Sequence, residues 1–272
     1  MAALEQYLSA WNLTDPQLIA ETATSRVYTV THAGEKVVLK LLTSIGAEDE
    51  GTGALALAYW DGHGAIKLLR HDASAHLLEY VSGEDLIPLV QRGDDDAATA
   101  IIAEILNELH ADNGKPLPEG LVTLRRRFRS LFRYAETAPD SIYARAARIA
   151  EDLLNNPRDV RVLHGDMHHW NVRRHAQRGW LAFDPKGLVG EKTFDAANTL
   201  CNPVILPELV ADERRLLRAA DILARGMGVE VPRLLAFTFT YACLSAAWCL
   251  EDDCDPKLAL RVAAVAERHV RR

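Results

Sequence analysis

Apolar and polar positions follow one pattern in the first eighty residues and another in the rest of the chain. Near the N-terminus, short β-branched runs stand on both sides of a turn at Ala33-Gly34, which is typical of a β-hairpin. Between the later runs, residues 47–60 are expected to form a helix with acidic residues in its first turn. The segments that we expect to form strands are 29–31, 37–42, 65–69 and 76–80.

After residue 82, apolar residues recur at helical intervals. Ile101, Ile105 and Leu109 are four residues apart and share one face, whereas Glu104 and Glu108 lie on another. The segments that we expect to form helices are 97–110, 121–137, 141–154, 212–225, 232–250 and 256–271. The pattern therefore predicts an α+β chain with a small β-rich lobe over residues 1–81 and a large, mostly helical lobe over residues 82–272.

The composition is that of an ordinary globular protein. Of 272 residues, 49% are apolar and 25% are charged, so the chain is long enough to bury a sizeable core. A formal charge of −7 argues against nucleic acid as a partner and suits a cationic one. The four cysteines form no C-x-x-C pair and no basic-then-apolar leader opens the chain, which favours a cytoplasmic protein with reduced thiols.

One apolar segment resembles a membrane span at first sight. Residues 234–250 are almost unbroken apolar sequence, and Glu251-Asp252-Asp253 follow at once. A span needs roughly 20 apolar residues, and this run is shorter and contains threonine and serine. We therefore expect a helix buried in the core of the helical lobe and no membrane partner.

The most informative motif is H-G-D-x-x-x-x-N, which begins at His164 and is followed by Asp184. Apolar runs precede Asp166 and Asp184, so both carboxylates are expected on loops just after buried strands. Phosphoryl transfer needs one carboxylate to orient a hydroxyl and oxygen ligands to hold Mg²⁺ on a nucleotide. We expect Asp166 to be the catalytic base, Asn171 and Asp184 to bind the metal, and His164 to support the loop.

The β-rich lobe offers candidate nucleotide contacts. Lys40 ends the apolar run V-V-L-K and is expected to meet the phosphates, with Glu50 as its candidate partner. Glu50 could equally be a charge that complements the helix dipole. No glycine-rich loop is present, and Ser25 stands where its hydroxyl could contact phosphate. The linker at Glu79 and Val81 is expected to border the adenine.

Three further acidic residues have open roles. Asp195 is expected to accept backbone N–H bonds that hold the catalytic loop. Glu191 could contact the substrate or be a charge at a helix N-terminus. Glu251 belongs to an acidic cluster that is either a solvated face or a contact for a polycationic substrate.

Two other classes of protein compete with the kinase. His164, Asp166, His168, His169 and Asp184 could form a metal centre for hydrolysis, since imidazoles and carboxylates suit zinc, iron or manganese. The sequence shows no second ligand cluster, and this alternative leaves an asparagine without a role. A binding-only pseudokinase is disfavoured because the lysine, the asparagine and both aspartates are all present.

Several strings resemble the aminoglycoside/hydroxyurea antibiotic resistance kinase family, in particular the streptomycin 6-phosphotransferases within it. They are V-L-H-G-D-M-H-H-W-N-V and G-W-L-A-F-D-P-K-G-L-V-G-E-K-T-F-D-A-A-N, with G-A-I-K-L-L, H-L-L-E-Y and Y-A-C-L-S-A-A-W elsewhere. The resemblance covers nearly the whole chain. D-P-x-G-L-V-G-E is more specific to this group than H-G-D-x-x-x-x-N, which many small-molecule kinases share.

The resemblance implies a bilobal protein-kinase-like fold and ATP- and Mg²⁺-dependent phosphorylation of an antibiotic hydroxyl, with streptomycin as the first candidate. Hydroxyurea or another small metabolite alcohol is the alternative acceptor. The implied roles are base for Asp166, metal binding for Asn171 and Asp184, and phosphate contact for Lys40. The family's glutamate is matched only loosely at Glu50. We expect a monomer.

Overall fold

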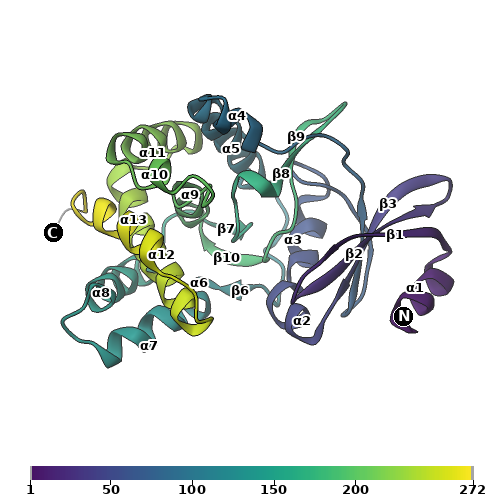
Figure 1. Cartoon of the computed structure of the whole chain (residues 1–272), viewed down its shortest axis with the longest axis horizontal. Coiled ribbons are helices and arrows are strands. Elements are labelled where there is room, and N and C mark those ends of the chain that lie inside the picture. The colour runs from purple at the N-terminus through teal and green to yellow at the C-terminus, as the bar shows by residue number, and fades with distance from the viewer. Residues whose placement is uncertain (1, 271–272) are drawn as a thin grey trace.

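The computed structural model describes residues 2–270, apart from the side chains of residues 2 and 48–50. An N-terminal β-sheet and a helical C-terminal part form two lobes (Figure 1). The sheet is antiparallel with strand order β1-β2-β3-β5-β4. The strands are β1 (Leu13–Glu21), β2 (Ser25–His32), β3 (Glu35–Leu42), β4 (Leu68–His71) and β5 (Ala75–Glu79).

The expected hairpin is confirmed as β2 and β3. Ala33 and Gly34 join the strands with φ angles of 50° and 84°, as a tight two-residue hairpin turn requires. Leu39 and Val30 point from this hairpin into a small core. Trp11, from helix α1 (Ala2–Trp11), belongs to the same core. This core is what holds the sheet to the N-terminal helix.

Other expectations for the N-lobe need correction. The single helix expected over 47–60 is two helices, α2 (Ser44–Glu50) and α3 (Gly53–Trp60). The break falls at Gly51 and Thr52, and the Thr52 hydroxyl donates to the carbonyl of Lys186 in the other lobe at 2.7 Å. The strand expected over 65–69 begins only at Leu68, as β4.

The C-lobe contains most of the helices. They are α4 (Ile87–Gln91), α5 (Asp95–Leu109), α6 (Leu124–Arg127), α7 (Arg129–Thr137), α8 (Ile142–Asn155), α9 (Thr193–Leu200), α10 (Pro207–Val210), α11 (Glu213–Met227), α12 (Val231–Glu251) and α13 (Lys257–Glu267). All six expected helical segments contain helix. In the segment expected over 121–137, residues 122–123 form strand β6, so the helix begins only at Leu124, where the Thr123 hydroxyl accepts from the N–H of Arg126. The helix is also divided at Phe128 into α6 and α7.

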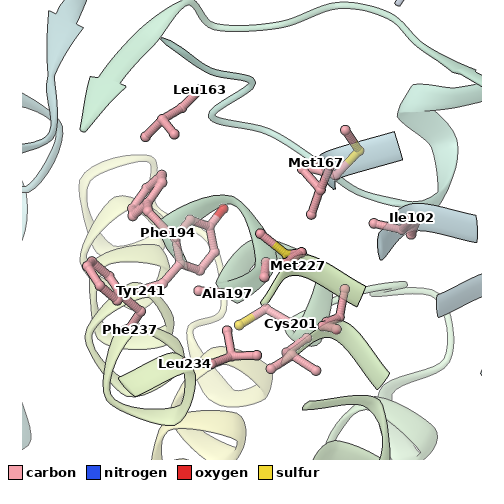
Figure 2. Close-up of a cluster of buried hydrophobic side chains, with 14 of the residues drawn as sticks. Ile102, Leu163, Met167, Phe194, Ala197, Cys201, Met227, Leu234, Phe237 and Tyr241 are labelled. Carbon is pink, nitrogen blue, oxygen red and sulfur yellow. The ribbon is translucent and has the colours of Figure 1, made fainter. Parts of the chain in front are cut away.

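Helix α12 is the apolar segment that resembled a membrane span. By length and hydropathy it could cross a membrane, but 67% of its most apolar window is buried inside the fold. Figure 2 shows Phe237 and Tyr241 of this helix beside Phe194 of α9, with ring centroids 6.4 Å and 5.6 Å from the Phe194 ring. The helix therefore forms the centre of the C-lobe core, as its flanking acidic residues predicted.

Two small sheets in the C-lobe precede the loops that contain Asp166 and Asp184. One has the order β6 (Val122–Thr123), β10 (Leu188–Glu191), β7 (Val160–Leu163), and the other is the hairpin β8 (Val172–His175) and β9 (Gly179–Ala182). The hairpin touches the N-lobe: the Ile66 N–H donates to the Ala182 carbonyl at 3.0 Å, and the Ala182 N–H donates to Gly64 at 2.9 Å. The loops that follow β7 and β9 therefore open directly at the junction of the lobes.

A buried ion pair joins three elements of the C-lobe. Arg215 of α11 is 2% exposed and donates to both oxygens of Asp95 at the start of α5, at 2.9 Å and 3.0 Å. The same guanidinium donates to the carbonyls of Leu200 and Asn202 at the end of α9. Because every one of these groups is buried, removing either charge would leave the other uncompensated.

Candidate active site

A cleft of about 690 Å³ lies between the lobes. Its N-lobe wall comes from β1, β2, β3 and the linker after β5, and its C-lobe wall comes from the loops after β7 and β9. The lining includes most residues that the sequence singled out for chemistry. These are Ser25, Lys40, Glu79, Val81, Asp166, Asn171 and Asp184.

Asp195 holds the catalytic loop by its backbone, which is the contact expected from the sequence. Its two oxygens accept the N–H groups of His164 at 2.8 Å and Gly165 at 2.7 Å. The ring of His110, at the end of α5, adds a third contact to Asp195 at 2.9 Å. Gly165 has φ 79°, and a Cβ there would lie 2.7 Å from the Leu188 side chain, so only glycine fits this turn. Contacts outside the cleft therefore fix the backbone of the catalytic loop.

His164 links the catalytic loop to the segment after β9. Its Nε2 lies 3.0 Å from the Phe183 carbonyl, and its Nδ1 accepts the N–H of Asp166 at 3.2 Å. Both contacts fit a neutral ring with the proton on Nε2. Burial holds the pKa of His164 below its ordinary value, against the attraction of Asp195 and Asp166. The neutral His164 ring thus supports the catalytic loop by hydrogen bonding.

Asp166 is the carboxylate at the centre of the cleft. The Nδ2 of Asn198 donates to its Oδ1 at 3.0 Å, and the Nδ2 of Asn171 lies 3.3 Å from its Oδ2. Burial disfavours its charged form, but the nearby His168 ring, 3.6 Å from Oδ2, and the charge of Lys186 outweigh burial and hold the pKa of Asp166 below its usual range. Asp166 is therefore ionised at neutral pH, as a hydroxyl-orienting base must be.

Asn171 and Asp184 supply oxygen atoms suited to a divalent cation. Asn171 donates its Nδ2 to the Asp166 carbonyl at 2.9 Å, which leaves its Oδ1 available, and its own carbonyl accepts the Phe183 N–H at 3.0 Å. Asp184 has φ 60°, an uncommon left-handed conformation, and one of its oxygens contacts the Lys40 ammonium. Amide and carboxylate oxygens are the hard ligands that Mg²⁺ prefers, so these residues fit that metal.

The N-lobe wall has a hydroxyl-rich turn in place of a glycine-rich loop. The Thr22 hydroxyl accepts the N–H groups of Thr24 at 3.3 Å and Ser25 at 3.1 Å. Thr43, which caps α2, donates its hydroxyl to the Ala23 carbonyl at 2.8 Å. Local side-chain hydrogen bonds thus shape this turn. Ser25 is buried and its side chain lines the cleft.

The structure describes the side chain of Glu79 but not that of Glu50, the two acidic residues predicted to lie near the nucleotide. Glu79 lines the cleft, but its carboxylate is engaged by the guanidinium of Arg178 and by the N–H of Lys67 at 2.9 Å. Only its backbone is thus left for an adenine, as the linker prediction assumed. The side chain of Glu50 lies outside the described residues, so its pairing with Lys40 stays a prediction.

Glu191, for which the sequence left substrate contact and a helix N-terminal charge open, does not line the cleft, and its substrate role stays a prediction. It is 2% exposed, away from the cleft lining, and accepts from Arg233 at 2.6 Å and from the N–H of Arg158 at 2.8 Å. Glu251 likewise lies outside the cleft lining, where it accepts from the Ser130 hydroxyl at 2.9 Å and contacts Arg133. The substrate role of Glu251 stays a prediction, and Ser130 and Arg133 already contact its carboxylate.

Sequence reasoning missed three residues of the site: His110, Lys186 and Asn198. Lys186 lines the cleft and directly follows D-P in the motif that begins at Asp184. Asn198 lies three residues after Asp195, so it follows on the same helix face one turn later. That spacing was a usable signal for Asn198, whereas nothing in the sequence connects His110 to Asp195.

The metal-hydrolase alternative lacks a ligand cluster among residues 2–270 as described. No group of three or more His, Cys, Asp or Glu side chains there is arranged to hold a metal. His169 is fully buried, and burial together with the charge of Arg215 lowers its pKa to about 3. It is therefore a neutral interior residue of the C-lobe.

Comparison with known proteins agrees with this geometry. The aminoglycoside/hydroxyurea antibiotic resistance kinase family matches residues 10–253. A streptomycin 3''-kinase of Klebsiella pneumoniae is 37% identical over 90% of this chain and 91% of its own length. A streptomycin 6-kinase of Streptomyces glaucescens is 30% identical over 97% and 86%, and a hydroxyurea phosphotransferase of Kitasatospora aureofaciens is 30% identical over 96% and 76%.

Solved structures with the same fold share little sequence. A thermostable mutant of the aminoglycoside phosphotransferase APH(4)-Ia, in ternary complex with AMP-PNP and hygromycin B, superposes with a TM-score of 0.62 at 13% identity, covering 99% of this chain and 98% of that one. A choline/ethanolamine kinase family protein from Mesorhizobium loti gives 0.67 at 14% identity, covering 100% and 95%. The fold is therefore protein-kinase-like. The family match and the site together show that this chain belongs to the aminoglycoside/hydroxyurea antibiotic resistance kinases and is a small-molecule O-phosphotransferase.

Proposed function

We propose that the protein transfers the γ-phosphoryl group of ATP, with Mg²⁺, to a hydroxyl of streptomycin and thereby confers resistance to it. The observation that carries this proposal is the meeting of Asp166, Asn171, Asp184 and Lys40 in one cleft, in a chain whose curated relatives include streptomycin kinases. The net charge of −7 suits a cationic acceptor.

In the proposed reaction, Asp166 accepts a hydrogen bond from the acceptor hydroxyl and aligns its oxygen with the γ-phosphorus. As the new O–P bond forms and the bond to the β–γ bridging oxygen breaks, the hydroxyl proton passes to Asp166. Lys40 neutralises phosphate charge from the N-lobe side. Mg²⁺, held by Asn171 and Asp184, would supply further neutralisation of the phosphates. Positioning and electrostatics thus carry most of the catalysis.

The N-lobe contacts follow from the same proposal. The turn over residues 22–25 would cover the phosphates, with the Ser25 hydroxyl as one donor. Backbone groups of Glu79 and Val81 would border the adenine. We place the boundary between the lobes after residue 81, two residues beyond the end of β5 at Glu79. Because ATP is the donor, we propose a cytoplasmic protein, and we propose that it acts as a monomer.

A second acceptor follows from one specific observation. A relative that covers 96% of this chain is a hydroxyurea phosphotransferase, at the same 30% identity as the streptomycin 6-kinase. Hydroxyurea is small and uncharged, so it would use the same base and metal but gain nothing from an acidic surface. The two acceptors therefore predict different dependence of the acceptor KM on ionic strength.

The test is an acceptor panel with the purified protein, ATP and Mg²⁺. Streptomycin is expected to release ADP and to gain one phosphate by mass spectrometry, with fragment masses and NMR identifying the hydroxyl. Asp166→Ala serves as the inactive control. Turnover of hydroxyurea alone would move the assignment to the second acceptor, and no turnover with any aminoglycoside or with hydroxyurea would refute both.

A further inference from the structure

Asn198 is a buried amide that makes direct contact with the catalytic carboxylate. It lies on α9 and is 2% exposed, and its Nδ2 donates to Oδ1 of Asp166 at 3.0 Å. Asn198 is the last residue of the K-T-F-D-A-A-N string, but neither the resemblance nor the proposed metal site gives it a role. It is also not needed to hold the loop backbone, because Asp195 and Thr199 of the same helix do so through the N–H groups of His164 and Gly165 and the Met167 carbonyl.

The orientation of this amide is set by its second partner. The Nδ2 of Asn202 donates to the Asn198 Oδ1 at 2.9 Å and to the Asn198 carbonyl at 3.0 Å. A flipped Asn198 would point its oxygen at the Asp166 carboxylate and its NH₂ at the NH₂ of Asn202, which is unfavourable on both sides. The Asn202 carbonyl in turn accepts from Arg215 at 3.0 Å, so the chain of contacts ends on the buried Arg215–Asp95 pair.

The two oxygens of Asp166 are therefore held differently. Oδ1 has the contact with Asn198 at 3.0 Å, whereas the contacts described here for Oδ2 are longer, to Asn171 at 3.3 Å and to His168 at 3.6 Å. The Asn171 amide cannot replace Asn198, because its shorter bond, 2.9 Å, goes to the Asp166 carbonyl. One oxygen is thus anchored in the C-lobe and the other is left toward the cleft.

We propose that Asn198 is a positioning residue for phosphoryl transfer: it fixes the rotamer of Asp166 by holding Oδ1, so that Oδ2 is the oxygen that meets the acceptor hydroxyl. This inference rests on the proposed function, in which Asp166 orients that hydroxyl. A carboxylate free to rotate would spend time in orientations that align nothing with the γ-phosphorus, and such misalignment lowers the rate of the chemical step more than substrate binding.

The kinetic test compares two substitutions of Asn198. Asn198→Asp keeps the shape and still accepts from Asn202, but it turns a donor toward Asp166 into a repelling oxygen. Asn198→Ala removes the donor without repulsion. We expect kcat to fall by on the order of 100-fold for Asn198→Asp and on the order of 10-fold for Asn198→Ala, with both KM values within about twofold of wild type.

The order of these effects separates positioning from packing. If Asn198 only filled space in α9, the isosteric aspartate would be the milder change. Thr199→Val, which removes a loop contact that does not touch Asp166, is the matched control, and we expect it to lower the melting temperature. An Asn198→Ala variant slower than Asn198→Asp, or KM values that rise in step with the loss of kcat, would overturn the proposal.

A stability cycle tests the contact without requiring turnover. Asn198→Asp is expected to lower the melting temperature by several degrees in the wild-type background. In an Asp166→Asn background the charges are exchanged, so an amide again faces a carboxylate and most of the loss should disappear. An equal loss in both backgrounds would overturn the contact. A wild-type protein that phosphorylates no acceptor would instead overturn the proposed function. The stability cycle would still show whether Asn198 and Asp166 interact in the folded protein.

Discussion

The two walls of the cleft differ in how firmly their polar groups are held. Behind the C-lobe wall, Asp195 and Asn198 are buried, and they hold the catalytic loop and the Asp166 side chain through contacts of 2.7 Å to 3.0 Å. On the N-lobe wall, every residue of β1 after Leu13 is exposed, and the turn that begins at Thr22 is held by backbone contacts and by the hydroxyls of Thr22 and Thr43, which are exposed or half-buried. The chemistry therefore lies on the rigid wall, and the wall proposed to cover the phosphates is the one that can adjust.

This difference has a physical reason. Aligning a hydroxyl with a phosphorus atom tolerates little error in the position of the base, so its support must be buried and fully paired. A triphosphate presents many equivalent oxygens, so a turn with hydroxyls and N–H groups can meet it in more than one arrangement. Substitutions on the two walls should therefore have effects of very different size.

The largest effect is expected for Asp166→Ala. Losing the orienting base should lower kcat by on the order of 10³–10⁴-fold. ATP affinity, measured by calorimetry with a non-hydrolysable analogue, should stay within a few-fold of wild type, because the metal ligands are intact. Wild-type turnover by this variant would show that the rigid wall does not carry the base.

A second large effect is expected for Asp184→Ala and for removal of Mg²⁺. Without this carboxylate, Mg²⁺-dependent affinity for ATP should fall by on the order of 100-fold or more, since even outer partners of metal ligands contribute 10–100-fold. Titration of ATP with and without EDTA measures the difference. If EDTA weakened ATP binding to wild type and Asp184→Ala equally, Asp184 would not be a metal ligand.

Asp195→Ala tests the support of the rigid wall. The substitution leaves the buried N–H groups of His164 and Gly165 and the ring of His110 without their acceptor, so we expect a loss of about 3 kcal/mol in the free energy of unfolding. Urea denaturation measures this loss. Asp112→Ala, at an exposed turn just beyond His110, is the control and should change stability by less than about 0.5 kcal/mol.

The smallest effect is expected on the N-lobe wall. Thr22→Val removes the hydroxyl that accepts from the N–H groups of Thr24 and Ser25, which should cost about 1 kcal/mol and raise the KM for ATP roughly fivefold. Its kcat should change little. A loss of kcat as large as that of Asp195→Ala would contradict the contrast between the walls, because it would mean that the turn is as tightly constrained as the catalytic loop.

Elements with a clear internal pattern were predicted well from sequence. The helix expected over 141–154 is α8 (Ile142–Asn155), and the hairpin around Ala33-Gly34 is β2 and β3. Strand β1 was missed because its residues after Leu13 face solvent, so no alternation marks it, and Pro16 lies within it. The helix expected over 121–137 begins only at Leu124, because residues 122–123 pair with β10, which is distant in the chain.

The same distinction holds within the site. Asp166 and Asn171 are five residues apart on one loop, so the motif itself predicts their proximity. The hydrogen bonds from Asp195 to the catalytic loop were also expected, because Asp195 follows that loop closely in the chain. His110 is 85 residues from its partner Asp195, and no local pattern connects the two. Contact with substrate stayed open for Glu191 because no local pattern indicates its partner Arg233, 42 residues away.

The residues alone determine the class of chemistry, since an acid, an amide and a second acid at short spacings are enough to indicate metal-assisted phosphoryl transfer. They also determine most of the helices, because helical periodicity is a local property of the chain. Only the tertiary structure decides which oxygen of Asp166 is anchored and which acidic residues form ion pairs with arginines. It also decides how many buried contacts support each wall of the cleft. Those outcomes depend on contacts between segments far apart in the chain, and such contacts leave no periodic trace in the sequence.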